Sequence, residues 1–175
     1  MAQKGHRHLI AAVPELVDRF PDVAVVIIGH GTLREELVRQ AAALGVGDHV
    51  HLPGFRADAR MLLDAADVFA LPSQQEAMPL AALEAMDAGL PVVATCVFGS
   101  AEVVVDRGTG FLVPRGEPAA LAGAIGELLA DPGLRRRYGA AGRARYLQRY
   151  TSARMAAETL AVYDEVLAAV PSGTW

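Results

Sequence analysis

Residues 67–95 read DVFALPSQQEAMPLAALEAMDAGLPVVAT, and this stretch predicts a strand, a loop, a helix and a second strand. The run DVFALP at 67–72 is apolar without alternation, and PVVAT at 91–95 has the same character. Continuous runs of this kind are typical of strands that are buried on both faces, and a helix between two such strands is the crossover that a parallel sheet requires. The stretch therefore predicts the α/β class.

The same alternation extends in both directions along the chain. VAVVII at 23–28 and VHLPG at 50–54 indicate strands upstream, and GFLV at 110–113 indicates one downstream. From Pro118 the pattern is helical to about residue 170. We therefore expect one domain over 1–175, a Rossmann-like parallel sheet flanked by helices with an all-helical C-terminal segment.

Capping signals mark several of the expected helices. Thr32 and Glu35 have the spacing of a capping box, and Gly45 suits the stop of the same helix. Asp58 can cap the next helix, and Asp131 stands before a proline at the start of a later one.

Composition restricts the class of protein. The 175 residues are enough for one domain with a sizeable core, and no run approaches the roughly 18 apolar residues of a membrane span. Cys96 is the single cysteine, which excludes an internal disulfide, and MAQKGHRHLI has no signal-peptide core. A net charge of -4 argues against a nucleic-acid partner. We expect a soluble cytoplasmic protein.

Two glutamates flank the start of the helix in the opening stretch. Glu76 lies in the loop that leaves the first strand, and Glu84 lies in the second turn of the helix that Pro79 begins. Ligands of open α/β sheets bind at the carboxyl ends of the strands, where a helix N-terminus offers free amides to an anion. A carboxylate there can bind a diol. From spacing alone, two ordinary surface charges are an equally good interpretation.

Glu76, seven intervening residues, Glu84 and then EAMDAGLPVVAT closely resemble the signature of the retaining, nucleotide-sugar-dependent glycosyltransferases called group 1. That family has two Rossmann-like domains, the GT-B architecture. The resemblance continues through GSAEVVVDRGTGFLVPRGEPAALAGAIGELLADP at 99–132 and, upstream, through QKGHRHLIAAV, VIIGHGTLREEL and VHLPGF. It implies the C-terminal, donor-binding domain of such an enzyme.

The resemblance implies a role for each glutamate. Glu84 would bind the ribose hydroxyls of the donor, and Glu76 would face the sugar and the reaction centre. The donor would be a UDP-, GDP- or ADP-sugar, the acceptor a glycan, lipid or small molecule, and neither a cofactor nor a metal would be required. The phosphates would meet free amides of Met78, Leu80 and Ala81.

The upstream segments would complete the donor site. Lys4, the only lysine in the chain, stands in the family's lysine-glycine pair and would neutralise the diphosphate. Gly29 and Gly31 would let the backbone approach the ligand, although two glycines by themselves match an ordinary turn. The turn beside the nucleobase would consist of Gly54, Phe55 and Arg56.

The sequence departs from the family pattern in two loops. Ala77 stands where glycine is usual, so a positive φ at that position would strain the loop. FGSAE at 98–102 has one glycine where a pair is usual, which predicts a stiffer loop.

Relatives open this domain with a strand before the lysine-glycine pair, yet only three residues precede Lys4. In the strand order 3-2-1-4-5-6 that strand is central. We therefore expect VAVVII and DVFALP either to pair with each other or to flank a gap that a partner chain or an ordered terminus fills. The N-terminal acceptor-binding domain is missing as well, so this chain alone is expected to be inactive.

Two other function classes are open. A sugar-nucleotide epimerase would need further acid and base groups beyond Glu76, and a catalytically silent nucleotide-binding or interaction module would fit Ala77. The histidine pairs at 6 and 8 and at 49 and 51 lack carboxylates, so no metal site is expected. Arginines over 135–149 predict a solvated basic face, with peripheral contact to anionic lipid as an alternative.

Overall fold

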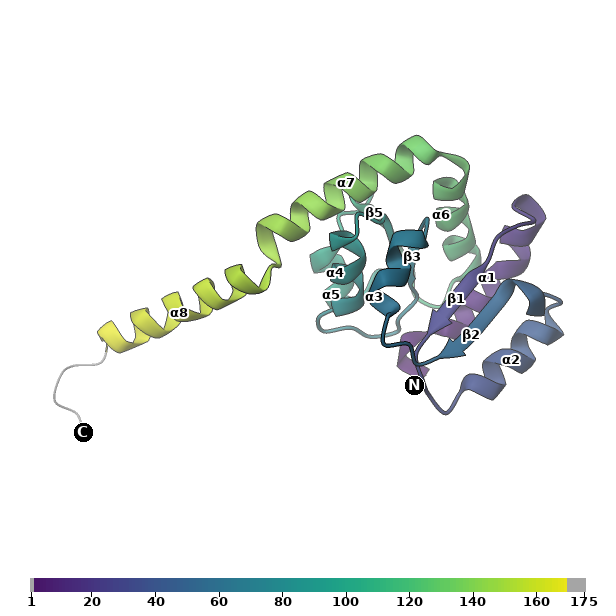
Figure 1. Cartoon of the computed structure of the whole chain (residues 1–175), viewed down its shortest axis with the longest axis horizontal. Helices are drawn as coiled ribbons and strands as arrows, with labels where there is room; N and C mark the ends of the chain where they lie inside the picture. The colour runs from purple at the N-terminus through teal and green to yellow at the C-terminus, as the bar shows by residue number, and fades with distance from the viewer. Residues whose placement is uncertain (1, 170–175) are drawn as a thin grey trace.

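The computed structural model describes residues 2–169 and confirms the α/β class, with five parallel strands and flanking helices (Figure 1). The strands are β1 (Val25–Ile28), β2 (Val50–Gly54), β3 (Phe69–Leu71), β4 (Val92–Thr95) and β5 (Gly110–Val113). The helices and 3-10 turns are η1 (Ala2–Lys4), α1 (His6–Arg19), α2 (Arg34–Ala43), η2 (Gly47–His49), α3 (Ala59–Leu62), η3 (Leu63–Ala65), α4 (Leu80–Asp87), α5 (Phe98–Val103), α6 (Pro118–Ala130), α7 (Pro132–Arg149) and α8 (Ser152–Ala169).

The strands form two separate parallel sheets. One holds β1 and β2, the other holds β3, β4 and β5 in that order, and no backbone hydrogen bond joins the two among residues 2–169. Of the two expected outcomes, β1 and β3 therefore flank a gap and do not pair. Residues 23–28 and 67–71 line part of a single large cavity between β1 and β3, and we call this part the strand slot.

Helix α1 packs against both sheets. Its Leu9 and Leu16 join the core that includes Val93 of β4 and Phe111 of β5, whereas Ile10 and Val13 join the core around β1, α2 and β2. Helices α1 and α6 cover one face of the three-stranded sheet, and α4, α5 and α7 cover the other. Since the sheets share no hydrogen bonds, α1 is the main element that joins them.

The prediction that every strand is buried on both faces holds for β4 and is wrong for β1. All four residues of β4 are buried, but Val26 of β1 is 53% exposed. Helices lie on both faces of β4, whereas the face of β1 that carries Val26 has no helix packed over that side chain.

Of the four predicted capping signals, Asp131 and Gly45 are confirmed and two are wrong; Gly45 has φ 71 just after the end of α2. The Leu134 amide donates to Asp131 Oδ1 at 2.9 Å. Helix α2 begins two residues after Thr32 and has no side-chain cap, so the capping box does not form. The Asp58 carboxylate binds the guanidinium of Arg56 instead of capping α3.

The arginines of α7 do not form a uniform solvated face. Arg135 donates to the carbonyls of Leu128 and Leu129 at the end of α6, and Arg145 donates to those of Glu102 and Val103. The exposed members are Arg136, Arg137, Arg143 and Arg149. Helix α8 extends away from the body and is exposed throughout (Figure 1). None of the helices in the described range has the length and apolar character needed to cross a membrane.

Two helical glycines give a matched test of the packing between α4 and α7. A Cβ at Gly139 would lie 1.9 Å from the carbonyl oxygen of Gly89, whereas a Cβ at Gly123 would meet open space. We expect Gly139→Ala to lower the free energy of unfolding by about 1 to 3 kcal/mol or more, because packed backbone must move. Gly123→Ala should raise it by about 0.5 to 1 kcal/mol. Urea unfolding measures both, and equal effects would contradict the close approach of the two helices.

Candidate active site

Lys4 and Glu76, 72 positions apart in the sequence, form an ion pair. Lys4 Nζ lies 2.7 Å from Glu76 Oε1, and the Ser73 hydroxyl donates to the same oxygen at 2.7 Å. The Glu76 side chain is 8% exposed, whereas that of Lys4 is 46% exposed. The carboxylate is therefore held in place from one side, and the ammonium group can still reach a ligand.

A close backbone contact places Lys4 beside this loop. Gly5 has φ 65, and a Cβ there would lie 1.9 Å from the carbonyl oxygen of Pro72. The Gln74 amide donates to the carbonyl of Gln3 at 2.7 Å. Only glycine fits both the left-handed conformation and the short distance. The lysine-glycine pair thus fixes the start of α1 to the loop after β3.

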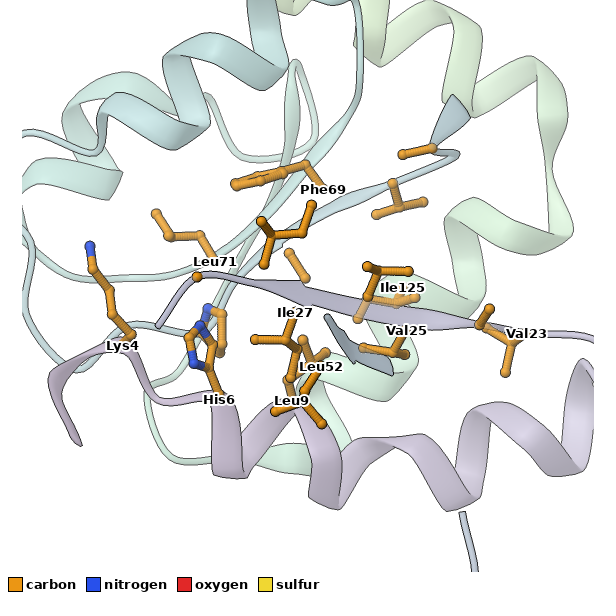
Figure 2. A pocket seen from close by; sticks show the side chains of 18 of the residues that line it. Lys4, His6, Leu9, Val23, Val25, Ile27, Leu52, Phe69, Leu71 and Ile125 are labelled. Atoms are coloured by element: carbon orange, nitrogen blue, oxygen red, sulfur yellow. The ribbon is translucent and has the colours of Figure 1, made fainter. Parts of the chain in front are cut away.

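Several of the predicted binding residues line one cavity of about 1410 Å³. Lys4, Gly29, Gly31, Ala81 and Glu84 contribute to its lining at the carboxyl ends of β1 and β3. Figure 2 shows Lys4 and His6 at one end of this cavity, with apolar side chains from the strands along the rest. Gly29 and Glu84, which come from different sheets, therefore border the same space, as predicted, whereas Glu76 and Phe55, which were expected around the same cleft, do not belong to this lining.

The turn after β2 adjoins the turn after β1. The Gly29 amide donates to the Gly54 carbonyl at 2.9 Å, and the rings of His30 and Phe55 meet edge to face with centroids 6.2 Å apart. Phe55 is 70% exposed, so its ring is available to a planar ligand. The Arg56 side chain is held by Asp58, and its hydrogen bonds lower the pKa of the Asp58 carboxyl.

The start of α4 differs from the prediction in one amide. Pro79 is the N-cap residue, and the Leu80 amide donates to the Met78 carbonyl at 3.0 Å. The prediction of a free Leu80 amide is therefore wrong, because the chain turns tightly around Pro79. The amides of Met78 and Ala81 have no backbone acceptor within the part of the chain that the structure describes. Two backbone donors at the start of α4 thus have no backbone partner.

The backbone strain that the sequence predicts for a positive φ at Ala77 does not occur, because Ala77 has no positive φ. Between residues 2 and 169, Arg107 is the one non-glycine residue with positive φ. The loop instead depends on Gly99, whose amide donates to the Glu76 carbonyl at 3.0 Å and whose added Cβ would lie 2.3 Å from the Ala77 carbonyl oxygen. The single glycine of FGSAE therefore stands where the two loops touch.

Sequence reasoning missed two histidines as parts of this site. His6 lines the cavity next to Lys4 (Figure 2). The pKa of His6 lies below the ordinary 6.5, mainly because the side chain is partly buried and also because positive charges, including that of Lys4, lie nearby. His30 lines the same cavity beside Gly29 and Gly31. Both stand within two residues of a predicted site residue, which was the available signal. No group of three or more metal-ligating side chains occurs in the described range.

The family model for glycosyl transferases group 1 matches residues 1–145. The chain belongs to this family. A GDP-mannose-dependent alpha-(1-6)-phosphatidylinositol monomannoside mannosyltransferase from Mycolicibacterium smegmatis is 40% identical over 152 residues, which are 81% of this chain and 39% of the relative. A D-inositol 3-phosphate glycosyltransferase from Salinispora tropica is 39% identical over 171 residues, 91% of this chain and 35% of the relative.

Solved group 1 and related structures have the same fold. HepE from Anabaena in complex with UDP superposes with a TM-score of 0.84 at 30% identity, over 93% of this chain and 46% of that one. The C-terminal domain of a group 1 glycosyl transferase from Francisella tularensis gives 0.79 at 27% identity, over 87% of this chain and 82% of that one. This chain thus spans less than half the length of the curated relatives described above and most of an isolated C-terminal domain.

The histidine at the cavity makes stability depend on pH. Because the folded pKa of His6 lies below 6.5, the unfolded chain binds the proton first as the pH falls. The contribution of neutral His6 to the free energy of unfolding is therefore fully present above about pH 6.5, and it decreases as the pH falls toward the folded pKa. We expect His6→Gln to reduce the loss of unfolding free energy between about pH 7.5 and 5.5, measured by urea titration. Burial and the charge of Arg7 also lower the pKa of His8. Part of the pH-dependent loss of unfolding free energy should therefore remain in the His6→Gln variant.

The matched control is His51→Gln, which replaces an exposed histidine on β2. If both variants changed the pH dependence equally, burial of His6 would not be its cause.

Proposed function

We propose that this chain is the nucleotide-sugar-binding half of a retaining glycosyltransferase, with its donor site at the carboxyl ends of β1 and β3. The observation that supports this most is that Lys4, Gly29 and Glu84 border one cavity although they come from three separate segments. Brought together at this edge of a parallel sheet, they offer a cation, an approachable backbone and a diol-binding carboxylate.

The ion pair between Lys4 and Glu76 suggests how donor binding prepares the site. A diphosphate competes with Glu76 for the ammonium group, which is half exposed and has a flexible stem. As Lys4 turns to the phosphates, Glu76 keeps its hydrogen bond from Ser73 and becomes free on the side that faces the sugar. One group thus neutralises the donor while the other is released to orient the transferred sugar.

Charge on the leaving phosphate is the main chemical problem in this reaction. When the bond between the anomeric carbon and the diphosphate breaks, negative charge grows on the phosphate oxygen and positive charge on the sugar. The amides of Met78 and Ala81 at the start of α4 supply backbone donors for the phosphate, and Lys4 supplies a positive charge on a flexible stem. Glu76 supplies a carboxylate near the sugar. No metal ion is needed in this proposal, since Lys4 provides the positive charge.

Other features bear on the nucleobase of the donor and on the acceptor of the sugar. The exposed ring of Phe55, with His30 edge-on to it, offers a stacking surface to any nucleobase. One relative is named for GDP-mannose, and HepE was solved with UDP, so UDP and GDP are the first donors to test, with ADP third. The acceptor would contact mainly a second domain; one relative is named for phosphatidylinositol monomannoside and another for D-inositol 3-phosphate.

Replacing Glu84 tests the ribose contact. We expect Glu84→Gln to weaken binding of UDP or GDP by about 1 to 3 kcal/mol, or about 5- to 150-fold, because charged hydrogen bonds to a diol are lost. Isothermal titration calorimetry measures the affinity. Glu127→Gln, an exposed glutamate on α6, is the control and should leave it unchanged. An unchanged affinity in Glu84→Gln would make Glu84 a surface charge, and no binding of any nucleotide to the parent chain would favour the silent module.

Transfer is expected to need the acceptor half. We predict that this chain alone, given UDP- or GDP-sugars and simple polyol acceptors, turns over far more slowly than about 1 per second, the low end of ordinary enzymes. Coupled release of free nucleotide measures this. Turnover at the ordinary rate would mean that the acceptor surface lies within these 175 residues. Interconversion of donor sugars without release would instead support an epimerase.

A further inference from the structure

Helix α5 is short, and its start is tied to the loop that carries Glu76. The helix has six residues, whereas isolated helices shorter than about 12 residues are marginal in water. The Gly99 amide donates to the Glu76 carbonyl at 3.0 Å, and a Cβ at Gly99 would lie 2.3 Å from the Ala77 carbonyl oxygen. The position of α5 therefore determines where the backbone of Glu76 and Ala77 can lie.

Arg145 and Tyr150, at the C-terminal end of α7, hold the other end of α5. Arg145 Nε donates to the Val103 carbonyl at 2.9 Å, and Arg145 Nη2 donates to the Glu102 carbonyl at 2.8 Å. The Tyr150 hydroxyl donates to the same Glu102 carbonyl at 3.1 Å. The last carbonyls of a helix have no donor within the helix, so these hydrogen bonds satisfy groups that α5 leaves unpaired.

The guanidinium of Arg145 is used for this contact and not for an acidic partner. It takes part in none of the ion pairs within residues 2–169. Its Cζ lies 5.8 Å from the centroid of the Tyr150 ring, and the side chain is partly buried. A planar guanidinium can donate to two neighbouring acceptors at once, and a cation at the C-terminal end of a helix is favoured by the helix dipole.

Apolar packing accompanies these hydrogen bonds. Val103 and Val104, at the end of α5, are buried in the core beside α4 and β4, and Tyr146 and Tyr150 pack against the same core. The hydrophobic effect has no direction, whereas hydrogen bonds to two successive carbonyls do. Packing therefore keeps α5 on the body of the domain, and Arg145 sets its orientation.

We propose that Arg145 is a positioning residue of the donor site: supported by Tyr150, it holds α5, and through Gly99 the Glu76 loop, in the position that binding the sugar part of the donor requires. The inference rests on the proposed function, in which Glu76 faces the transferred sugar. Arg145 itself acts only through α5, since its hydrogen bonds go to the carbonyls of that helix and to the Tyr150 hydroxyl.

The proposed contacts of the nucleoside come from other segments. Gly29 follows β1, Phe55 follows β2 and Glu84 lies on α4, so α5 supplies none of them. Loss of the Arg145 contacts therefore weakens binding of a sugar nucleotide more than binding of the same nucleotide without its sugar. A residue that only stabilised the fold would change both affinities by the same factor.

Isothermal titration calorimetry of the whole chain with UDP and UDP-glucose, and with GDP and GDP-mannose, measures this difference. We expect Arg145→Ala to weaken binding of the sugar nucleotide about fivefold or more, and binding of the nucleotide less than about twofold. Tyr150→Phe keeps the ring beside the guanidinium and removes one hydrogen bond. It should act in the same direction by about two- to threefold, and it carries the test if urea unfolding shows that Arg145→Ala does not fold.

The matched control is Arg135→Ala. Arg135 lies on the same helix and also donates to two carbonyls at the end of a helix, those of Leu128 and Leu129, but that helix is α6, which packs against α1. The control should change the two affinities by the same factor. Without ligand, hydrogen exchange of the Gly99 amide, followed by NMR, should be about tenfold or more faster in Arg145→Ala than in Arg135→Ala.

Three results would count against the proposal in different ways. Equal changes in the affinities for nucleotide and sugar nucleotide, in Arg145→Ala or, where that variant does not fold, in Tyr150→Phe, would overturn it. A parent chain that binds nucleotides but neither sugar nucleotide would overturn it as well. Absence of any nucleotide binding to the parent chain would instead refute the proposed function, and the Gly99 exchange rates would then decide whether Arg145 holds the Glu76 loop.

Discussion

Helix α1 holds together two sheets that share no backbone hydrogen bond. It places Ile10 and Val13 in the core of the two-stranded sheet and Leu9 and Leu16 in that of the three-stranded sheet. Each fully buried aliphatic side chain contributes about 1.5 to 3 kcal/mol. Val23 and Val25 of the β1 segment also pack against the core of the three-stranded sheet. The relative placement of the halves therefore depends on side-chain packing, to which α1 contributes on both sides, in place of the central ladder that an unbroken parallel sheet would provide.

The proposed donor site depends on the same helix. One residue, Gly5, separates Lys4 from the start of α1, and it fits there only because it has no side chain to meet the Pro72 carbonyl. Gly29 is positioned by one sheet, and Glu76 and Glu84 by the other. A nucleotide bound at the carboxyl ends would therefore contact groups from both halves. Its affinity would depend on how well the packing of α1 holds the two halves together.

Sequence reasoning located the features that local chemistry decides. The runs VHLPG and GFLV gave strands with the predicted bounds, since β-branched and apolar residues favour buried strands. Asp131 before a proline gave the predicted cap. The ion pair between Lys4 and Glu76 was not predicted: the family resemblance assigned both residues to one site, but no local pattern relates residues 72 positions apart.

The failures come from tertiary context. Thr32 has the right spacing for a cap, but the chain enters α2 two residues later. Val26 belongs to an apolar run, yet whether a helix covers it depends on segments far along the chain. The Leu80 amide is used in a tight turn that the sequence around Pro79 does not specify. His6 was missed because its burial results from packing between α1 and the cavity.

The central claim is that one site, formed by both halves of the domain, binds a nucleotide diphosphate. Backbone amide NMR of the whole chain, titrated with UDP and with GDP, tests it most directly. The account predicts that the largest shifts occur at Gly29, Gly31, Phe55, Met78 and Ala81, with a common saturation curve, because these amides adjoin one cavity or its rim. Shifts confined to one half, or centred on the exposed arginines of α7, would contradict it.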